Sequence, residues 1–482
     1  MKKILLVMFL FNIVCNAKAF DFSVICNTGQ TLYYTITSVA NKTVAVVPQN
    51  ASINANGTYY DTAPSGELTI PEIVNFNNID YKVISLGDYV FYNCLYLRGN
   101  LIIPGFVTSI GKYAFSICLG MTGSLTIPGS VTDIGDFAFN RCSFTGVLNI
   151  PSSVKSIGIE AFYNCSNLTG RVTIPISVNS IGEAAFSNCP KITSLNVESG
   201  NKRYSSDNDL IYSLIKDTII MCPSGKTGNL NILGSVTTIG SAAFSNCTLL
   251  TGSLNIPNSV KSIESSAFIY CTSLTGNLNI PNSVKSIGFE AFHGCSGFNG
   301  GLTISGSLTS IDFFTFMGCT GLTGSLTIPI SVTSIGNNAF MYCSGLTSIY
   351  ANAITPIQLG INVFYNVNKI NCTLYVPAGS KSAYQAAEQW KDFVNIVEMT
   401  TAVPTVNKVN IKLYPNPVTE YFQIDGIEGS AILLLWDLNG QLLLQKQIVN
   451  NEKISIDNFS SGSYISKVVN AQGAISMKMV KK

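Results

Sequence analysis

Residues 253–276 read SLNIPNSVKSIESSAFIYCTSLTG, and variants of this stretch recur from about residue 80 to about residue 347. The cysteine of the A-F-x-x-C core returns every 24 residues, once after 23, with one longer gap. These ten cysteines are Cys94, Cys118, Cys142, Cys165, Cys189, Cys247, Cys271, Cys295, Cys319 and Cys343. A period of about 20 to 29 residues with Leu or Ile at fixed positions is typical of a leucine-rich solenoid. One unit is too small to bury its own apolar face, so we expect the units to stack around a shared core.

A single unit, residues 124–146, shows how one coil should fold. Leu125 and Ile127 alternate with polar residues, which is the pattern of a strand with one buried face. A second extended segment follows, and Gly135 then allows a turn. We expect residues 138–142 to form a short helical turn. The sequence therefore predicts a mainly β solenoid of about eleven coils with short helical turns.

The repeated motif also carries a family resemblance. The pattern S-L-T-I-P-x-S-V-x-S-I-G-x-x-A-F-x-x-C resembles the bacterial leucine-rich repeat of BspA-like surface proteins over roughly residues 29–398. The resemblance implies a secreted or surface-displayed binding protein. Some members of that family act as adhesins for host matrix proteins or for other bacteria.

The N-terminus has the features of a secretory signal peptide, residues 1–19. Two lysines precede an apolar run at residues 4–14, and A-K-A supplies a small-x-small site for cleavage between Ala19 and Phe20. The alternative is lipidation at Cys15, but a valine precedes this cysteine where a lipobox needs a small residue. We therefore expect the mature chain to start at Phe20.

Changes in the repeat pattern suggest the domain boundaries. We expect an N-terminal cap with a hairpin at residues 20–75, the solenoid with its C-terminal cap at 76–398, and a linker at 399–408. The period breaks at 196–227, a charged insertion that we read either as a contact patch or as a solvated hairpin.

The last domain, residues 409–482, has a separate pattern of seven short apolar runs, which predicts a small β-sandwich. Its motifs resemble those of a type IX secretion sorting domain, and the residues that carry this likeness are Tyr414, Pro415, Asn416, Pro417, Gly440, Gly462 and Tyr464. The resemblance implies a partner in the type IX secretion machinery and export to the outer-membrane cell surface or the medium. Such tails are often removed, with the product either anchored or released.

Composition argues against several other classes of protein. The 482 residues are 11% charged with a net charge of +2, so no basic patch predicts nucleic-acid binding. No apolar run after residue 14 is long enough to span a bilayer. Fourteen cysteines in an exported chain would suggest disulfides, but ten share one position of the repeat, so we expect buried free thiols. A zinc site is not expected, because the chain has one histidine and no C-x-x-C pair.

The sequence offers no convincing catalytic site. His293 is the only imidazole, and its repeat position is elsewhere filled by Ser, Asn, Tyr, Ile or Met, as expected for a coil surface. Asp207 and Asp209 lie in a turn-rich segment. The G-K-T at 225–227 lacks the earlier glycine of a phosphate loop, because Ile220 stands there. We predict no catalytic residue, no cofactor and no metal.

What remains is the outer surface of the strands. In S-L-T-I-P the Leu and Ile face inward, so the residue between them faces out, and we expect these residues to form a stripe on the concave face. The stripe comprises Thr126, Asn149, Thr173, Asn231, Asn255, Asn279, Thr303 and Thr327. Such residues could bind an extracellular protein or glycan, as in an adhesin, or could simply tolerate exposure on a strand. The alternatives to a binding protein are a structural surface scaffold without a dedicated ligand and an accessory module for an enzyme.

Overall fold

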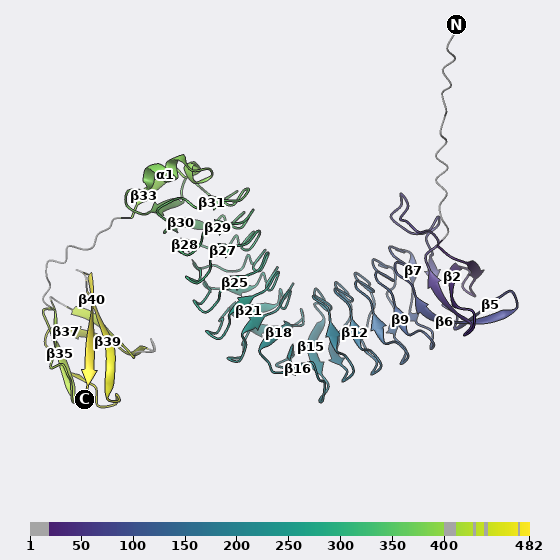
Figure 1. Cartoon of the computed structure of the whole chain (residues 1–482), viewed down its shortest axis with the longest axis horizontal. Helices are drawn as coiled ribbons and strands as arrows, with labels where there is room; N and C mark the ends of the chain where they lie inside the picture. The colour runs from purple at the N-terminus through teal and green to yellow at the C-terminus, as the bar shows by residue number, and fades with distance from the viewer. Residues whose placement is uncertain (1–18, 400–410, 428–429, 438–441, 471–472) are drawn as a thin grey trace, which may run out of the picture. The chain divides into compact units, whose positions relative to one another are not determined.

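The chain divides into two compact units, split between Met399 and Thr400 (Figure 1). The computed structural model describes residues 19–399, 411–427, 430–437, 442–470 and 473–482. The fold is mainly β, with 35% strand and 2% helix, as the repeat pattern predicted. The predicted signal peptide and most of the predicted linker lie outside the described residues.

The first unit is a solenoid of about 13 turns, whose coils stack side by side in a curved row (Figure 1). This is somewhat more than the expected eleven, because segments without the repeat motif also complete turns. In the insertion, for example, the amide of Cys222 donates to the carbonyl of Ala243 at 2.7 Å, as a phenylalanine amide does in a regular coil.

A first parallel ladder, divided among three separate sheets, runs through the S-I dipeptides of successive coils. Ile110, Ile134 and Ile157 occupy matching positions and are buried, while the preceding residues face outward. Its strands are β9 (Ser109–Ile110), β11 (Asp133–Ile134), β12 (Ser156–Ile157), β14 (Ser180–Ile181), β20 (Thr238–Ile239), β22 (Ser262–Ile263), β25 (Ser286–Ile287), β27 (Ser310–Ile311), β29 (Ser334–Ile335) and β31 (Gln358–Leu359).

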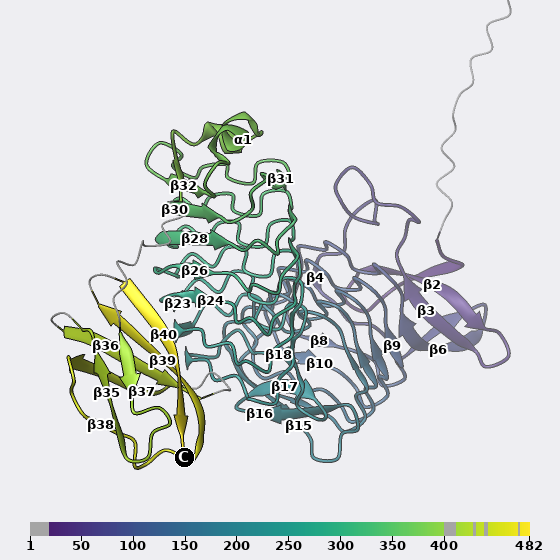
Figure 2. The same cartoon turned by 60° about the vertical axis from the view of Figure 1, so that its left-hand side comes forward.

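A second parallel ladder follows the S-L-T-I-P segments, and Figure 2 shows its later strands one above another. Its strands are β8 (Leu101–Ile102), β10 (Leu125–Thr126), β13 (Gly170–Ile174), β15 (Ile192–Val197), β24 (Leu278–Asn279), β26 (Leu302–Thr303), β28 (Gly324–Ile328), β30 (Leu346–Ala351), β32 (Thr373–Val376) and β33 (Asn395–Glu398). Shorter pairings also occur among β4 (Gly66–Glu67), β7 (Leu97–Arg98), β19 (Gly228–Asn229), β21 (Leu250–Ser253) and β23 (Leu274–Thr275).

The A-F-x-x-C segment corrects one detail of the expected coil. Residues 138–142 form tight turns instead of a helical turn, because Phe137 and Arg141 both have a φ of 57°, which a right-handed helix excludes. The freed amides bond to the next coil, as when the Phe139 amide donates to the Ala161 carbonyl at 2.8 Å. The turn thus becomes another ladder between coils.

The glycine that follows the S-I dipeptide in most coils has a different role from the expected turn. A Cβ on Gly135 would lie 2.7 Å from the carbonyl carbon of Gly111 in the preceding coil, and one on Gly158 would lie 2.4 Å from the Asp136 amide nitrogen. In these coils glycine allows the neighbouring backbones to approach closely, whereas Glu264 and Asp312 occupy the matching position in two other coils.

The interior is built from two repeated columns. Successive phenylalanine rings stack, with centroids 5.6 Å apart for Phe115 and Phe139 and 5.3 Å apart for Phe139 and Phe162. The ten cysteines of the motif are all buried, as expected. The phenylalanine column is Phe91, Phe115, Phe139, Phe162 and Phe186 before the insertion, and Phe244, Phe268, Phe292, Phe316, Phe340 and Phe364 after it.

Both ends of the solenoid are covered by dedicated segments. At the N-terminus, the expected hairpin pairs β2 (Thr31–Ser38) with β3 (Thr43–Val47), and the sheet continues through β6 (Ile79–Leu86) into the first ladder. The remaining strands of this cap are β1 (Phe22–Ile25) and β5 (Ile73–Phe76).

At the C-terminus, the cap contains α1 (Lys381–Ala386) and the 3-10 helix η1 (Trp390–Asp392). Trp390 closes the phenylalanine column, with its ring 5.3 Å from Phe364 and its indole N–H donating to the Ile357 carbonyl at 2.9 Å.

The insertion folds into an antiparallel hairpin, β16 (Tyr204–Asp207) with β17 (Leu210–Ser213), followed by β18 (Thr218–Met221), which joins the first ladder beside β20. The hydrophobic core is divided here. Leu210 belongs to the cluster of the later coils, whereas its neighbour Ile211 belongs to the cluster of the earlier coils.

The second unit has seven described strands, matching the seven predicted runs. A three-stranded sheet and a four-stranded sheet enclose one core that contains Phe422, Leu433 and Val468. The strands are β34 (Lys412–Tyr414), β35 (Tyr421–Asp425), β36 (Ser430–Trp436), β37 (Leu442–Val449), β38 (Ile454–Ser455), β39 (Gly462–Asn470) and β40 (Gly473–Lys481).

Candidate functional site

The predicted outward stripe lies at the solenoid surface. Its members flank buried apolar residues: Thr303, for example, is exposed between Leu302 and Ile304, which are 2% and 4% exposed. Thr173 and Thr327 are partly exposed. The exposed members are Thr126, Asn149, Asn231, Asn255, Asn279 and Thr303.

The stripe is most regular in the later coils. Asn279, Thr303 and Thr327 occupy matching positions in the adjacent strands β24, β26 and β28. In the earlier coils the ladder is broken into separate pairs, where Thr126 lies beside Ile102 and Thr173 lies beside Asn196. The later coils therefore present the longest continuous row.

Two tyrosines that sequence reasoning missed extend this row. Thr327 is in register with Tyr350 on β30, which is in register with Tyr375 on β32. Their partly exposed rings stack with centroids 4.6 Å apart and planes 8° apart. In the segments I-Y-A and L-Y-V the tyrosine lies between two apolar residues, as the threonine does in L-T-I. This alternation was the sequence signal that could have placed both tyrosines in the row. We call Asn279, Thr303, Thr327, Tyr350 and Tyr375 the outer row.

Two aspartates of the insertion form ion pairs with lysines of the same segment. The Lys216 ammonium lies 2.6 Å from the Asp207 carboxylate, and the Lys226 ammonium lies 3.4 Å from that of Asp209. Asp209 also accepts from the Ser194 hydroxyl at 2.7 Å, and this hydrogen bond is the main cause that lowers the pKa of Asp209. Each aspartate is thus engaged by its own lysine, which does not suit a pair of carboxylates for acid–base catalysis.

The cysteine column is bonded to the backbone of the preceding coil. The thiol of Cys142 donates to the Phe115 carbonyl at 3.0 Å, and Cys319 donates to Phe292 at 3.1 Å. Burial raises the pKa of Cys319 to about 12, which keeps the thiol protonated at neutral pH. Among the described residues no group of three or more His, Cys, Asp or Glu side chains is placed to hold a metal ion.

His293 packs against aromatic side chains at the coil surface. Its ring centroid lies 5.1 Å from that of Tyr270 and 6.5 Å from that of Phe314. Partial burial lowers the pKa of His293, although Glu290, 3.8 Å from Nδ1, acts in the opposite direction. A neutral imidazole between rings is consistent with packing.

The G-K-T segment at 225–227 does not form a phosphate cradle. A Cβ on Gly225 would lie 2.4 Å from the carbonyl oxygen of Ile192, and the Gly225 amide donates to that same oxygen at 2.9 Å. The Lys226 ammonium donates to the Asn208 carbonyl at 2.8 Å. These donors are already used within the solenoid.

In the second unit, the Y-P-N-P motif holds the final strand. The side-chain amide of Asn416 donates to the Lys478 carbonyl at 2.8 Å and accepts from the Val480 amide at 2.9 Å. Tyr464 is buried on β39, and its hydroxyl donates to the Ser460 carbonyl. Gly462 begins β39, whereas the predicted motif residue Gly440 lies outside the described residues.

Comparisons with known proteins agree with this architecture. Residues 47–208, 221–322 and 276–387 match the BspA type leucine rich repeat region, in six copies. Residues 412–482 match the secretion system C-terminal sorting domain, which indicates export through type IX secretion. A search of curated proteins found no match.

Two solved structures of leucine-rich repeat proteins are similar to this chain, and the first of them shows the likeness in fold. A leucine-rich repeat protein from Eubacterium ventriosum is 20% identical, with a TM-score of 0.52, over 72% of this chain and 95% of that one. A leucine rich cell surface protein from Faecalibacterium prausnitzii is also 20% identical, with a TM-score of 0.45, over 76% of this chain and 97% of that one.

In the part of the chain that the structure describes, no helix is long and apolar enough to cross a membrane. The repeat match spans more than half of the sequence. The chain therefore belongs to the BspA type leucine rich repeat family and carries a secretion system C-terminal sorting domain.

Proposed function

We propose that this exported protein is a binding protein, for example an adhesin, that recognises an extracellular protein or glycan through the outer row. The observation that carries the proposal is the unbroken register from Asn279 to Tyr375 across five neighbouring strands. At about 4.8 Å per strand, this row is about 19 Å long.

The chemistry of the outer row suits many weak contacts. Its Asn and Thr side chains are short, neutral and able to donate and accept hydrogen bonds. The stacked pair of Tyr350 and Tyr375 supplies the larger contact area that is typical of binding hot spots. The proposal includes no bond-making chemistry, and it is supported by matches to repeat families rather than to enzyme families.

Capture of partners by the full chain tests the proposal. The mature protein is presented with host matrix proteins and with bacterial surface glycans, and the bound material is quantified. Tyr375→Ala and Thr303→Arg should each weaken capture about tenfold or more, as hot-spot substitutions do. The matched control is Thr309→Arg, an exposed threonine of the same coil outside the row. If no partner is captured, or if the row variants bind like the control, a structural scaffold becomes the better reading.

A further inference from the structure

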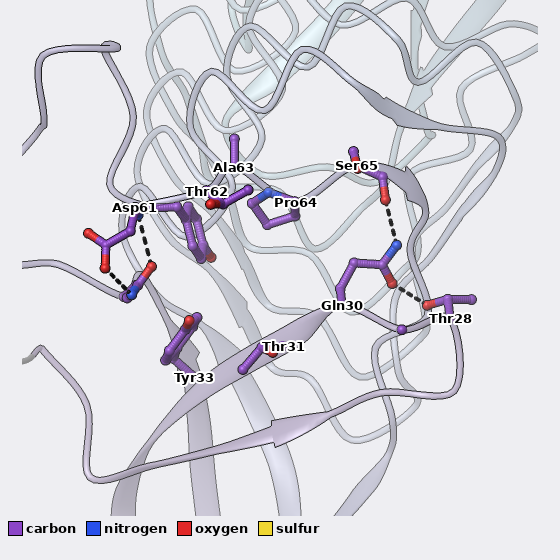
Figure 3. Close-up of a pocket in the computed structure, with 12 residues that line it drawn as sticks. Thr28, Gln30, Thr31, Tyr33, Asp61, Thr62, Ala63, Pro64 and Ser65 are labelled. Atoms are coloured by element: carbon purple, nitrogen blue, oxygen red, sulfur yellow. Dashed lines mark hydrogen bonds between the residues drawn. The ribbon is translucent and has the colours of Figure 1, made fainter.

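A polar hollow in the N-terminal cap lies apart from the outer row. It has a volume of about 460 Å³ and is formed where β2 faces the loop at residues 61–65. Figure 3 shows Thr31 and Tyr33 on one side of the hollow and Asp61, Pro64 and Ser65 on the other. The volume is within the range of small-molecule sites, about 300 to 1,000 Å³.

The polar groups of the hollow are held in place before any ligand arrives. The Asp61 carboxylate accepts from the Gln49 amide at 2.7 Å and from the Asn50 amide at 3.0 Å. The Gln30 amide donates to the carbonyls of Ser65 at 2.6 Å and Glu67 at 2.7 Å. Groups fixed in this way lose little conformational entropy when they bind a ligand.

Aromatic side chains complete the lining. Tyr33 is partly exposed, and within the described residues its hydroxyl has no hydrogen-bond partner. Burial and the nearby Asp61 carboxylate raise the pKa of Tyr33, so the hydroxyl stays a neutral donor. The buried Tyr60 ring lies 5.9 Å from that of Tyr33, and its hydroxyl donates to the Val90 carbonyl.

The negative charge in the lining of the hollow favours neutral ligands over anionic ones. Asp61 is its only ionised group, and no ion pair involves this carboxylate in the described parts of the chain. A carboxylate without a basic neighbour repels phosphate, sulfate and uronate groups. Each oxygen of Asp61 already accepts one side-chain amide and keeps a second lone pair that can accept from a ligand hydroxyl.

We infer that this hollow binds a neutral hexose unit of a glycan. The sugar hydroxyl groups would form hydrogen bonds with the Asp61 carboxylate and the Tyr33 hydroxyl, and the apolar face of the sugar would pack on the Tyr33 ring. A second hollow of about 530 Å³ shares Asp61, Thr62, Ala63 and Ser65 and is bounded by Leu95 and Tyr96. Tyr96 is 63% exposed, which suits it to contact the adjoining sugar of a longer chain. The site is independent of the outer row.

Calorimetric titration of the full chain with neutral tri- to hexasaccharides tests the inference. Acidic oligosaccharides of equal length and a simple diamine are titrated in parallel as comparison ligands. Neutral sugars should bind, and Asp61→Ala should weaken binding about 10- to 100-fold, as expected for hydrogen bonds to a charged group. Tyr33→Phe, which preserves the ring, should cost about 3- to 10-fold. Asp80→Ala should change nothing, since Asp80 also accepts from an amide, that of Asn75 at 2.7 Å, but lines neither hollow.

Three results would overturn the inference: equal or tighter binding of acidic sugars, binding of the diamine alone, or an Asp61→Ala variant that binds as the wild type does. Circular dichroism of each variant checks that the cap remains folded. Because Asp61 also orders Gln49 and Asn50, Asp61→Asn, which keeps one acceptor oxygen for these amides, serves as a milder second variant, and it should bind more weakly than wild type while the cap remains folded.

Discussion

The regular coils and the insertion bury their apolar side chains in different ways. In a regular coil each phenylalanine stacks on its copy in the next coil, so one core continues through the row. In the insertion the column is interrupted between Phe186 and Phe244, and β17 lies between two hydrophobic clusters. The repeated coils therefore share a continuous hydrophobic core, whereas the hairpin of the insertion divides that core into two clusters. A repeat protein of this kind should gain stability chiefly from contacts between neighbouring coils.

The largest expected effect concerns pH and the cysteines of the regular coils. Burial raises the pKa of Cys94 and Cys319 to about 12, above the value of about 8.5 in an unfolded chain. The protonated thiol is therefore favoured by folding, and its contribution to stability is complete below pH of about 8.5. Above that pH, each further pH unit lowers the free energy of unfolding by about 1.4 kcal/mol per buried thiol, until the pKa of the folded state is reached.

We thus expect the solenoid to melt at progressively lower temperature as pH rises from 9 towards 11, followed by circular dichroism. Cys142→Ala, which removes one thiol, should make the decline less steep although it lowers stability at pH 7. A melting temperature that stays constant up to pH 11 would contradict the burial of the thiol column.

The next effect concerns the phenylalanine column itself. Phe139→Ala should lower the free energy of unfolding by about 3 to 5 kcal/mol, because it leaves a cavity between the rings of Phe115 and Phe162. Phe313→Ala is the control, because Phe313 is 42% exposed at the coil surface. Chemical denaturation measures both variants, and similar losses for the two would show that the inner column does not dominate the stability.

The smallest effect tests the partition at the insertion with two adjacent residues of equal size. Leu210→Ala and Ile211→Ala should each cost about 2 to 4 kcal/mol, but in opposite halves of the solenoid. Hydrogen exchange measured by mass spectrometry should show faster exchange in the later coils for the first variant and in the earlier coils for the second. Equal acceleration of both halves in both variants would mean that the solenoid unfolds as one unit.

The repeat pattern predicted much of this architecture from local chemistry. Period, alternation and the A-F-x-x-C core placed Phe139 and Cys142 inside, and apolar runs in the tail predicted all seven strands of the second unit. Thr303 and its counterparts were correctly placed at the surface, because side chains alternate between the faces of a strand. The role of this surface in binding stays a prediction.

The sequence by itself thus determined which side chains enter the core and which coils resemble one another, because these properties follow from spacing along the chain. Only the tertiary structure decided what depends on contacts between coils. It replaced the expected helical turn by left-handed residues such as Phe137, and it assigned Gly135 to a close backbone approach. It also aligned Tyr350 with Tyr375, and it formed the hollow beside Asp61 from segments about 30 residues apart. The alternation in I-Y-A and L-Y-V could have placed both tyrosines on the outer face, but their stacking and the hollow depend on neighbours that meet only when the chain has coiled.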